Sequence, residues 1–182
     1  MKKISKLILR LAGWTIVTTV PEPPKSVICV APHTSNWDYI MGQLYYWAEG
    51  RKASFLIKKQ WFFFPLGALF RRLGGIAVDS ANGAKVVKTV VDEFNRRTTF
   101  HVAITPEGTR QPVKRWKMGF YNIAMEAKAP VQLAFIDYKQ KRLGITDLLT
   151  PSGDVKADMQ RIYDFYNGVA ACKPQRFCLP EI

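Results

Sequence analysis

Two short stretches of the sequence combine residue types that can do acid–base chemistry. The first, CVAPHTSNWDYI (29–40), places His33 just after an apolar run and Asp38 five positions later. A neutral imidazole can take a proton from a hydroxyl, and a carboxylate can fix its tautomer and stabilise the imidazolium. Ser35 to Asp38 also reads S-x-x-D, a helix start that accounts for Asp38 without chemistry. It does not account for His33.

The second stretch is TPEGTR (105–110), which follows another apolar run. T-P-E-G is favourable for a type I turn, so the glycine has a purely conformational explanation. Glu107 and Arg110 still carry functional groups, and the planar guanidinium suits a phosphate. If both apolar runs are parallel strands, both stretches lie at the same edge of the sheet, where ligands bind in α/β proteins.

Apolar runs alternate with helical periodicities along the whole chain. We expect strands at 26–31, 53–58, 76–78 and 99–104, and a hairpin of 130–138 with 141–148 around Lys139-Gln140. We expect helices at 36–47, within 61–75, at 83–97, 119–128 and 154–168. This order predicts a single α/β domain with a mixed, mostly parallel sheet flanked by helices.

The chain is strongly basic. It has 27 Lys and Arg against 14 Asp and Glu, a net charge of +13, with the excess confined to the first two thirds. Such a field favours nucleic acid, an anionic membrane or a phosphorylated substrate. Nucleic-acid motifs and an aromatic platform are missing, so we expect no nucleic-acid partner. Three unpatterned cysteines indicate neither disulfides nor a zinc site, and favour a reducing compartment.

The N-terminus, MKKISKLILRLAGW, predicts an amphipathic helix over residues 2–16. On a helical wheel the apolar residues share one face (Ile4, Leu7, Ile8, Leu11, Trp14) and the basic residues another (Lys2, Lys3, Lys6, Arg10). No run reaches the roughly 18 apolar residues of a spanning helix, and the interrupting charges argue against a signal peptide. The helix either docks on its own domain or lies in a membrane interface. Its purely cationic polar face favours the membrane.

Together, HTSNWD and PEGTR resemble the first and third sequence blocks of glycerolipid acyltransferases of the lysophosphatidate acyltransferase type. GGIAVDS (74–80) and KAPVQLAFIDY (128–138) resemble the second and fourth. The resemblance covers residues 26–146. It implies transfer of an acyl chain from acyl-CoA or acyl carrier protein to a hydroxyl of a lysophospholipid, with no cofactor and no metal. The expected division is an interfacial helix (1–20), an acyltransferase domain (26–170) and a C-terminal tail (171–182).

The chemistry of such a transfer assigns roles to individual residues. His33 is the general base, Asp38 orients it, and Glu107 aligns the acceptor hydroxyl. The substrate-binding residues expected are Gly108, Thr109, Arg110 and Lys58, and a backbone N–H near Gly108 or at the helix start is expected to hold the oxyanion. His101 is expected to be structural, because it is out of phase with its strand neighbours and has no evident carboxylate nearby.

One position departs from the family pattern. The second block usually carries an arginine that helps to hold the acceptor phosphate, and here that position is Ser80. Lys58 and Lys85 are the residues expected to compensate. Lysophosphatidate therefore remains the expected acceptor, at the cytoplasmic face of the inner membrane. The alternatives are an acceptor without glycerophosphate, or a lipid esterase that uses the same His–Asp pair with Ser35 as nucleophile.

Overall fold

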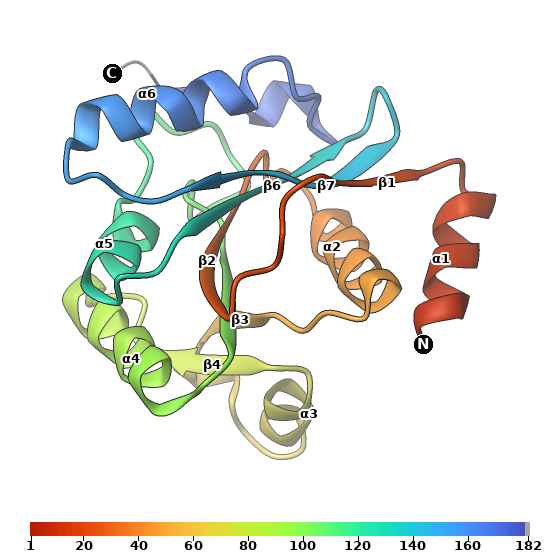
Figure 1. Cartoon of the computed structure of the whole chain (residues 1–182). Coiled ribbons are helices and arrows are strands. Elements are labelled where there is room, and N and C mark those ends of the chain that lie inside the picture. The colour runs from red at the N-terminus through yellow and green to blue at the C-terminus, as the bar shows by residue number, and fades with distance from the viewer. Residues whose placement is uncertain (181–182) are drawn as a thin grey trace.

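The computed structural model describes residues 1–180, which form one seven-stranded sheet between two layers of helices (Figure 1). The strand order is β1-β7-β6-β2-β5-β3-β4. The strands are β1 (Thr15–Thr18), β2 (Lys25–Val30), β3 (Ser54–Lys58), β4 (Gly75–Val78), β5 (Phe100–Ile104), β6 (Val131–Asp137) and β7 (Arg142–Leu149). The helices are α1 (Lys2–Leu11), α2 (Asn36–Glu49), α3 (Leu66–Arg72), α4 (Gly83–Arg96), α5 (Gly119–Glu126) and α6 (Val155–Tyr166), with short 3₁₀ turns at Lys59–Trp61 and Pro174–Arg176.

The expected fold class is confirmed: the chain is a single α/β domain with a mixed, mostly parallel sheet. Five strands run parallel, and β6 pairs antiparallel with β7, as the predicted hairpin requires. The central strand β2 is buried along Ser26–Cys29, which explains why its sequence is an unbroken apolar run and not an alternating one. The carboxyl ends of β2, β3 and β5 therefore meet at one edge.

Two core clusters lie on opposite faces of the sheet. One joins α4, α5 and α6 to the face of β2 that carries Val27 and Cys29. The other joins α1 and α2 to the face that carries Ile28. Figure 1 shows α1 and α2 on one side of the strands and α4 and α5 on the other. The alternation of side chains along β2 thus divides one apolar run between two helical layers.

The N-terminal helix is present but shorter than expected. It ends at Leu11, and Gly13 follows with φ of +79°. Residues 15–18, Thr-Ile-Val-Thr, form β1, which pairs in parallel with β7 at the edge of the sheet. The part of the predicted helix that lies beyond Leu11, residues 12–16, is therefore wrong. Its periodicity continued through Trp14, but β-branched residues and a left-handed glycine favour a turn into a strand.

The helix α1 contacts the domain through a narrow face. Ser5 and Leu9 are 2% and 1% exposed, and Lys6 lies 3.4 Å from Glu49 of α2. Four of the five apolar residues of the predicted membrane face remain in solvent: Ile4, Leu7, Ile8 and Leu11 are 62%, 56%, 46% and 79% exposed. The fifth, Trp14, is partly buried and packs against Tyr138, so its expected place on the membrane face is wrong. Docking on the domain therefore does not bury the apolar stripe. In residues 1–180 no helix is both long and apolar enough to cross a bilayer.

The start of α2 is built as S-x-x-D predicts. The Ser35 hydroxyl accepts a hydrogen bond from the backbone N–H of Trp37, and the Asp38 carboxylate accepts one from the backbone N–H of Ser35. This capping box fixes the direction in which the chain enters the helix after β2. It also brings Asp38 back towards the loop that carries His33.

Candidate active site

A cavity of 970 Å³ opens at the carboxyl ends of β2, β3 and β5, where the sequence places its chemistry-bearing residues. Of the predicted site residues, His33, Asp38, Lys58, Gly108, Thr109 and Arg110 line it. Glu107 does not. Apolar walls come from both faces of the sheet, with Tyr39 of α2 and Phe55 of β3 on one side and Val87 of α4 and Ile123 of α5 on the other. The cavity is thus large enough for a drug-sized ligand and mostly apolar, with a few polar groups gathered at one end.

The predicted His–Asp pair is formed. His33 Nδ1 lies 3.3 Å from Asp38 Oδ2, and the two side chains are 21% and 1% exposed. Among residues 1–180, no side chain or backbone group bonds His33 Nε2, and the residue lines the cavity. The arrangement leaves one imidazole nitrogen against the carboxylate and the other free for a substrate.

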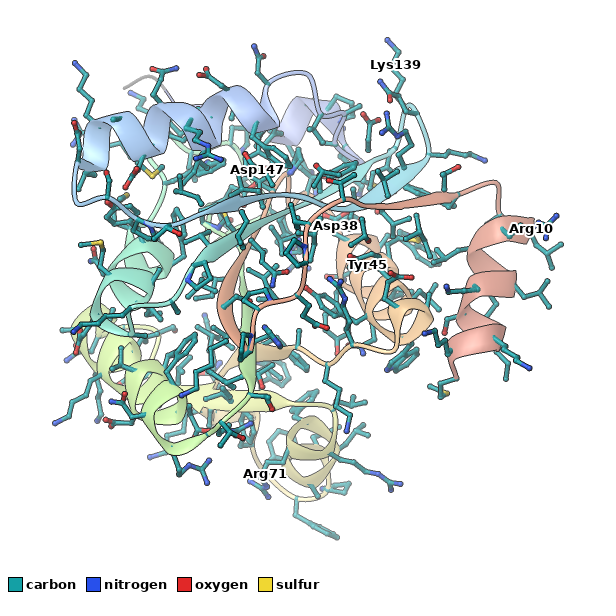
Figure 2. The ribbon with its side chains drawn as sticks, viewed as in Figure 1. Arg10, Asp38, Tyr45, Arg71, Lys139 and Asp147 are labelled. Atoms are coloured by element: carbon teal, nitrogen blue, oxygen red, sulfur yellow. The ribbon has the colours of Figure 1, made fainter. Side chains whose placement is uncertain are left out.

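Asp38 is held by four contacts. Oδ2 accepts hydrogen bonds from the backbone N–H groups of Thr34 (2.7 Å) and Ser35 (2.8 Å) and also faces His33. Oδ1 accepts one from the Tyr138 hydroxyl at 2.8 Å. Burial alone would raise the pKa of Asp38, but the bonds from His33, Tyr138 and the two amides outweigh it and hold the pKa below its usual range. The group is therefore a carboxylate at neutral pH. Figure 2 shows Asp38 among the side chains around the start of α2.

Glu107 has a different place from the one expected. The residue is 4% exposed, and Oε1 accepts a hydrogen bond from the backbone N–H of His33 at 2.8 Å. Oε2 is buried and has no partner among the described residues. Burial raises the pKa of Glu107 to about 7, against the lowering effect of the bond from His33. The Glu107 side chain therefore supports the backbone of the His33 loop. It does not line the cavity, where contact with an acceptor hydroxyl was expected.

Cationic groups surround the mouth of the cavity. Arg110 is exposed and donates from Nη1 to the side-chain oxygen of Asn36. Lys58 and Lys117 also line the cavity, and the Lys117 side chain passes over Gly108, where an added Cβ would approach its Nζ to 2.9 Å. Ser80, at the position of the usual arginine, lines the same cavity. Lys85 is not among the lining residues.

Three residues at the site were not singled out from the sequence. Asn36 and Tyr138 contact predicted site residues directly, and Lys117 lines the cavity. Asn36 lies within HTSNWD and Tyr138 ends the fourth block, so both belong to the sequence motifs, but neither motif indicates what these two side chains contact. Lys117 follows the PEGTR loop by seven residues and carries no signal of its own. These partnerships depend on packing over long distances along the chain.

The second histidine lies elsewhere. His101 Nδ1 lies 2.8 Å from the Ser26 hydroxyl, and Nε2 lies 3.7 Å from Glu22. The expectation that no carboxylate lies near His101 is therefore wrong, because Glu22 comes from the loop before β2. Burial lowers the pKa of His101, an effect that Glu22 opposes. The residue is not among those that line the cavity.

The family model named Acyltransferase matches residues 15–136 of the chain. This chain belongs to the acyltransferase family. The match covers both the His33–Asp38 stretch and the Glu107–Arg110 stretch. The acyltransferase is also similar in structure to a crystal structure of the 1-acyl-sn-glycerophosphate (LPA) acyltransferase PlsC from Thermotoga maritima. The TM-score is 0.63 at 16% sequence identity, over 92% of this chain and 76% of that one. At that identity the likeness supports the fold alone.

No curated protein matches the sequence of this acyltransferase. Within residues 1–180 of the acyltransferase, no three His, Cys, Asp or Glu side chains gather in a way that could hold a metal ion. The family assignment implies an acyl donor and an acceptor.

Proposed function

We propose that this acyltransferase moves a fatty acyl chain from acyl-CoA or acyl carrier protein to a free hydroxyl of a lysophospholipid, with lysophosphatidate as the acceptor and phosphatidate as the product. The observation that carries the proposal is the His33–Asp38 pair at the polar end of a largely apolar cavity. The apolar walls suit an acyl chain, and the cationic mouth suits a phosphate.

His33 acts as the general base. Its free Nε2 takes the proton of the acceptor hydroxyl while the hydroxyl oxygen attacks the thioester carbonyl carbon. The tetrahedral intermediate then expels the thiolate, and the imidazolium gives the proton that it took from the alcohol to this thiolate. An ester bond replaces the thioester bond, and the proton moves from the alcohol to the thiol. Asp38 stabilises the imidazolium between the two transfers.

The oxyanion formed in this step needs hydrogen-bond donors. The backbone N–H of Gly108, one of the two expected donors, is already bonded to the Thr105 carbonyl at 3.1 Å. The backbone N–H of Asn36, the first residue of α2, has no partner among residues 1–180, and Asn36 lines the cavity. We therefore assign the oxyanion to the start of α2, where the helix dipole also favours negative charge.

Arg110, Lys58 and Lys117 would bind the acceptor phosphate. All three are exposed and line the cavity, and Arg110 is positioned by Asn36 next to the His33 loop. Lys117 lines the cavity and Lys85 does not, so Lys117 takes the compensating role that was expected of Lys85. An acceptor without phosphate remains the alternative, because Ser80 replaces the family's usual arginine.

The esterase alternative has less support. It needs a nucleophile next to His33, and Ser35 is the nearest serine in the sequence. Ser35 is 8% exposed, its hydroxyl caps α2 through the backbone N–H of Trp37, and it does not line the cavity. A hydroxyl that is buried and committed to a helix cap is a poor candidate for an acyl-enzyme intermediate.

The proposal places the enzyme on the cytoplasmic face of the inner membrane through α1. Four apolar side chains of α1 are exposed while Ser5 and Leu9 make the domain contact, so the apolar stripe is available to a bilayer. Arg10 projects from α1 into solvent (Figure 2), and Lys3 is exposed as well. Binding would combine apolar burial with attraction to anionic headgroups, and salt would weaken the second contribution.

The test of the activity compares the native enzyme with His33→Ala and His101→Gln. Purified enzyme is given lysophosphatidate with acyl-CoA or acyl carrier protein thioester, and lipids are quantified by mass spectrometry. We expect phosphatidate from the native enzyme and His101→Gln, and almost none from His33→Ala at a similar melting temperature. Most of the activity surviving in His33→Ala would refute the general-base assignment. A better rate with a phosphate-free lysolipid would refute the acceptor.

The test of the membrane surface uses vesicles. Changing Lys2, Lys3, Lys6 and Arg10 to Gln should reduce binding to anionic vesicles and turnover on them, and should nearly spare turnover on a water-soluble short-chain acceptor. The matched control changes Lys88, Lys139, Arg142 and Lys156, four exposed cations of α4, the β6–β7 hairpin and α6, to Gln. Equal losses on both acceptors would mean that α1 is purely structural.

A further inference from the structure

We propose that Tyr138 is a positioning residue for the transfer reaction: its hydroxyl holds the Asp38 carboxylate in the orientation that faces His33. The inference rests on the proposed role of the His33–Asp38 pair and adds a third residue to it. Tyr138 follows β6, a hundred residues after Asp38, so no local motif links the two.

The two oxygens of Asp38 have separate partners. Oδ2 accepts the backbone N–H groups of Thr34 and Ser35 and faces His33, whereas Oδ1 accepts the Tyr138 hydroxyl at 2.8 Å. No other described residue bonds Oδ1. Without Tyr138 the carboxylate would be held through Oδ2 alone, with Oδ1 buried and unpaired at 1% side-chain exposure. Bonds to both oxygens fix the plane of the carboxylate relative to the imidazole.

Tyr138 is itself held in place by distant parts of the chain. Trp14, just after α1, packs edge-on against the Tyr138 ring with centroids 5.2 Å apart and planes at 90°. The backbone N–H of Tyr138 donates to the Ala170 carbonyl at 2.9 Å. The same C-terminal segment reaches the His33 loop, because the backbone N–H of Lys173 donates to the Thr34 hydroxyl at 3.1 Å. The position of the hydroxyl is thus determined by packing from both ends of the chain.

The Tyr138 hydroxyl remains a hydrogen-bond donor to Asp38 at every pH at which the enzyme works. Burial and the neighbouring Asp38 carboxylate raise the pKa of Tyr138, so the phenol keeps its proton over the whole working range of pH. Tyr138 does not line the cavity, so it has no direct access to substrate. Its effect on the reaction therefore passes through Asp38, in the way a group that orients the base's partner acts in other acid–base sites.

The first experiment is Tyr138→Phe, which removes the hydroxyl and keeps the ring against Trp14. We expect kcat to fall about tenfold and the KM for both substrates to stay within about twofold. The matched control is Tyr45→Phe. Tyr45 is buried on the same side of the sheet, on α2, and its hydroxyl bonds the Thr18 hydroxyl at 2.9 Å. Tyr45→Phe should leave kcat within about twofold of native. Equal kcat losses in the two variants would overturn the proposal.

The second experiment asks whether Tyr138 acts through Asp38. On an Asp38→Asn background, adding Tyr138→Phe should change kcat by less than about twofold, because the interaction that it supports is already lost. A structural contribution would instead reduce kcat by the same factor on both backgrounds, and this result would refute the positioning role. The comparison holds even if Tyr138→Phe lowers the melting temperature.

The two proposals fail in different ways. If His33→Ala is inactive and Tyr138→Phe has native kcat, the general-base assignment stands and the positioning role of Tyr138 is wrong. If His33→Ala keeps its activity, the proposed mechanism is wrong whatever Tyr138→Phe does.

Discussion

The carboxyl groups of Asp38 and Glu107 lie at neighbouring strand ends and are almost equally buried, yet their pKa values are shifted in opposite directions. Asp38 has four partners over its two oxygens, and its pKa lies below the usual range. Glu107 accepts one backbone N–H from His33, leaves Oε2 unpaired, and has its pKa raised to about 7. Burial favours the neutral form of both, so the number of donors decides which one stays charged.

The two carboxyl groups have different tasks, one electrostatic and one structural, and the sequence motifs do not distinguish them. A charged carboxylate can stabilise an imidazolium during the reaction, and Asp38 has the donors to remain charged. A carboxyl that is half protonated near neutral pH contributes less charge. Glu107 also contacts only the backbone N–H of His33, whereas Asp38 faces the His33 ring. We therefore assign Glu107 to loop geometry. In the TPEGTR stretch (105–110), Arg110 is the charged residue that faces the cavity.

The largest effect is expected from Asp38→Asn. The variant keeps an oxygen acceptor for the backbone amides but removes the charge, so we expect kcat to fall about 10³-fold or more. The control is Asp137→Asn, because Asp137 is also buried and its Oδ1 accepts the backbone N–H groups of Lys139 and Gln140. It should lose stability without a comparable loss of kcat. Steady-state kinetics with circular dichroism melts measure both, and similar kcat values in the two variants would remove the special role of Asp38.

An intermediate effect is expected at Glu107, where two substitutions give different results. Glu107→Ala removes the acceptor for the His33 N–H, and we expect kcat to fall about 10- to 100-fold. Glu107→Gln keeps an amide oxygen in that place, so kcat should stay within about threefold of native. If Glu107 instead aligned the acceptor hydroxyl as a carboxylate, Glu107→Gln would raise the acceptor KM. The two results are distinguished by initial-rate kinetics with the acceptor concentration varied.

A smaller effect is expected at Arg110. Arg110→Lys keeps the charge but loses the planar fork, so the KM of a phosphate-bearing acceptor should rise about five- to tenfold while the donor KM is unchanged. Arg115→Lys is the control, since Arg115 is exposed in the same loop and does not line the cavity. Equal changes in acceptor and donor KM would show that Arg110 only supports Asn36.

The last effect concerns stability instead of turnover: the two carboxyl groups should change the pH dependence of stability with opposite signs. The Glu107 pKa is raised from an ordinary value of 4.5 to about 7, so the folded state binds more protons than the unfolded state between these values. The free energy of unfolding therefore falls as pH rises through this window, by at most about 3 kcal/mol. Urea titrations at several pH values should show a flatter profile for Glu107→Gln than for the native enzyme.

Asp38 provides the opposite case. Its pKa is lowered in the folded state, so the stability it contributes is present above its unfolded pKa and is lost as pH falls. Asp38→Asn should therefore lessen the acid-side loss of stability and leave the fall between pH 4.5 and 7 in place. A flatter profile in that neutral window for Asp38→Asn would contradict the assignment of the two pKa shifts to their groups.

The sequence by itself determined most of the elements and the local geometry at His33. The alternation of apolar runs and helical periodicities predicted β2, β3, β4, β5 and the β6–β7 hairpin with bounds close to those observed. S-x-x-D predicted the capping box, and with it the proximity of Asp38 to the His33 loop. Such features depend on backbone hydrogen bonds between residues a few positions apart, so the residue types at those positions are enough to specify them.

Tertiary structure decided the rest. It joined Thr15–Thr18 to the sheet as β1, left the apolar stripe of α1 in solvent, and placed Glu107 under the His33 backbone and Tyr138 on Asp38. Each of these depends on partners more than 70 residues away in the chain or on which face of a helix finds a neighbour. Any buried polar group needs a hydrogen-bond partner. Only the packed chain determines that Tyr138 is the partner of Asp38 and that Glu107 Oε2 has none among the described residues.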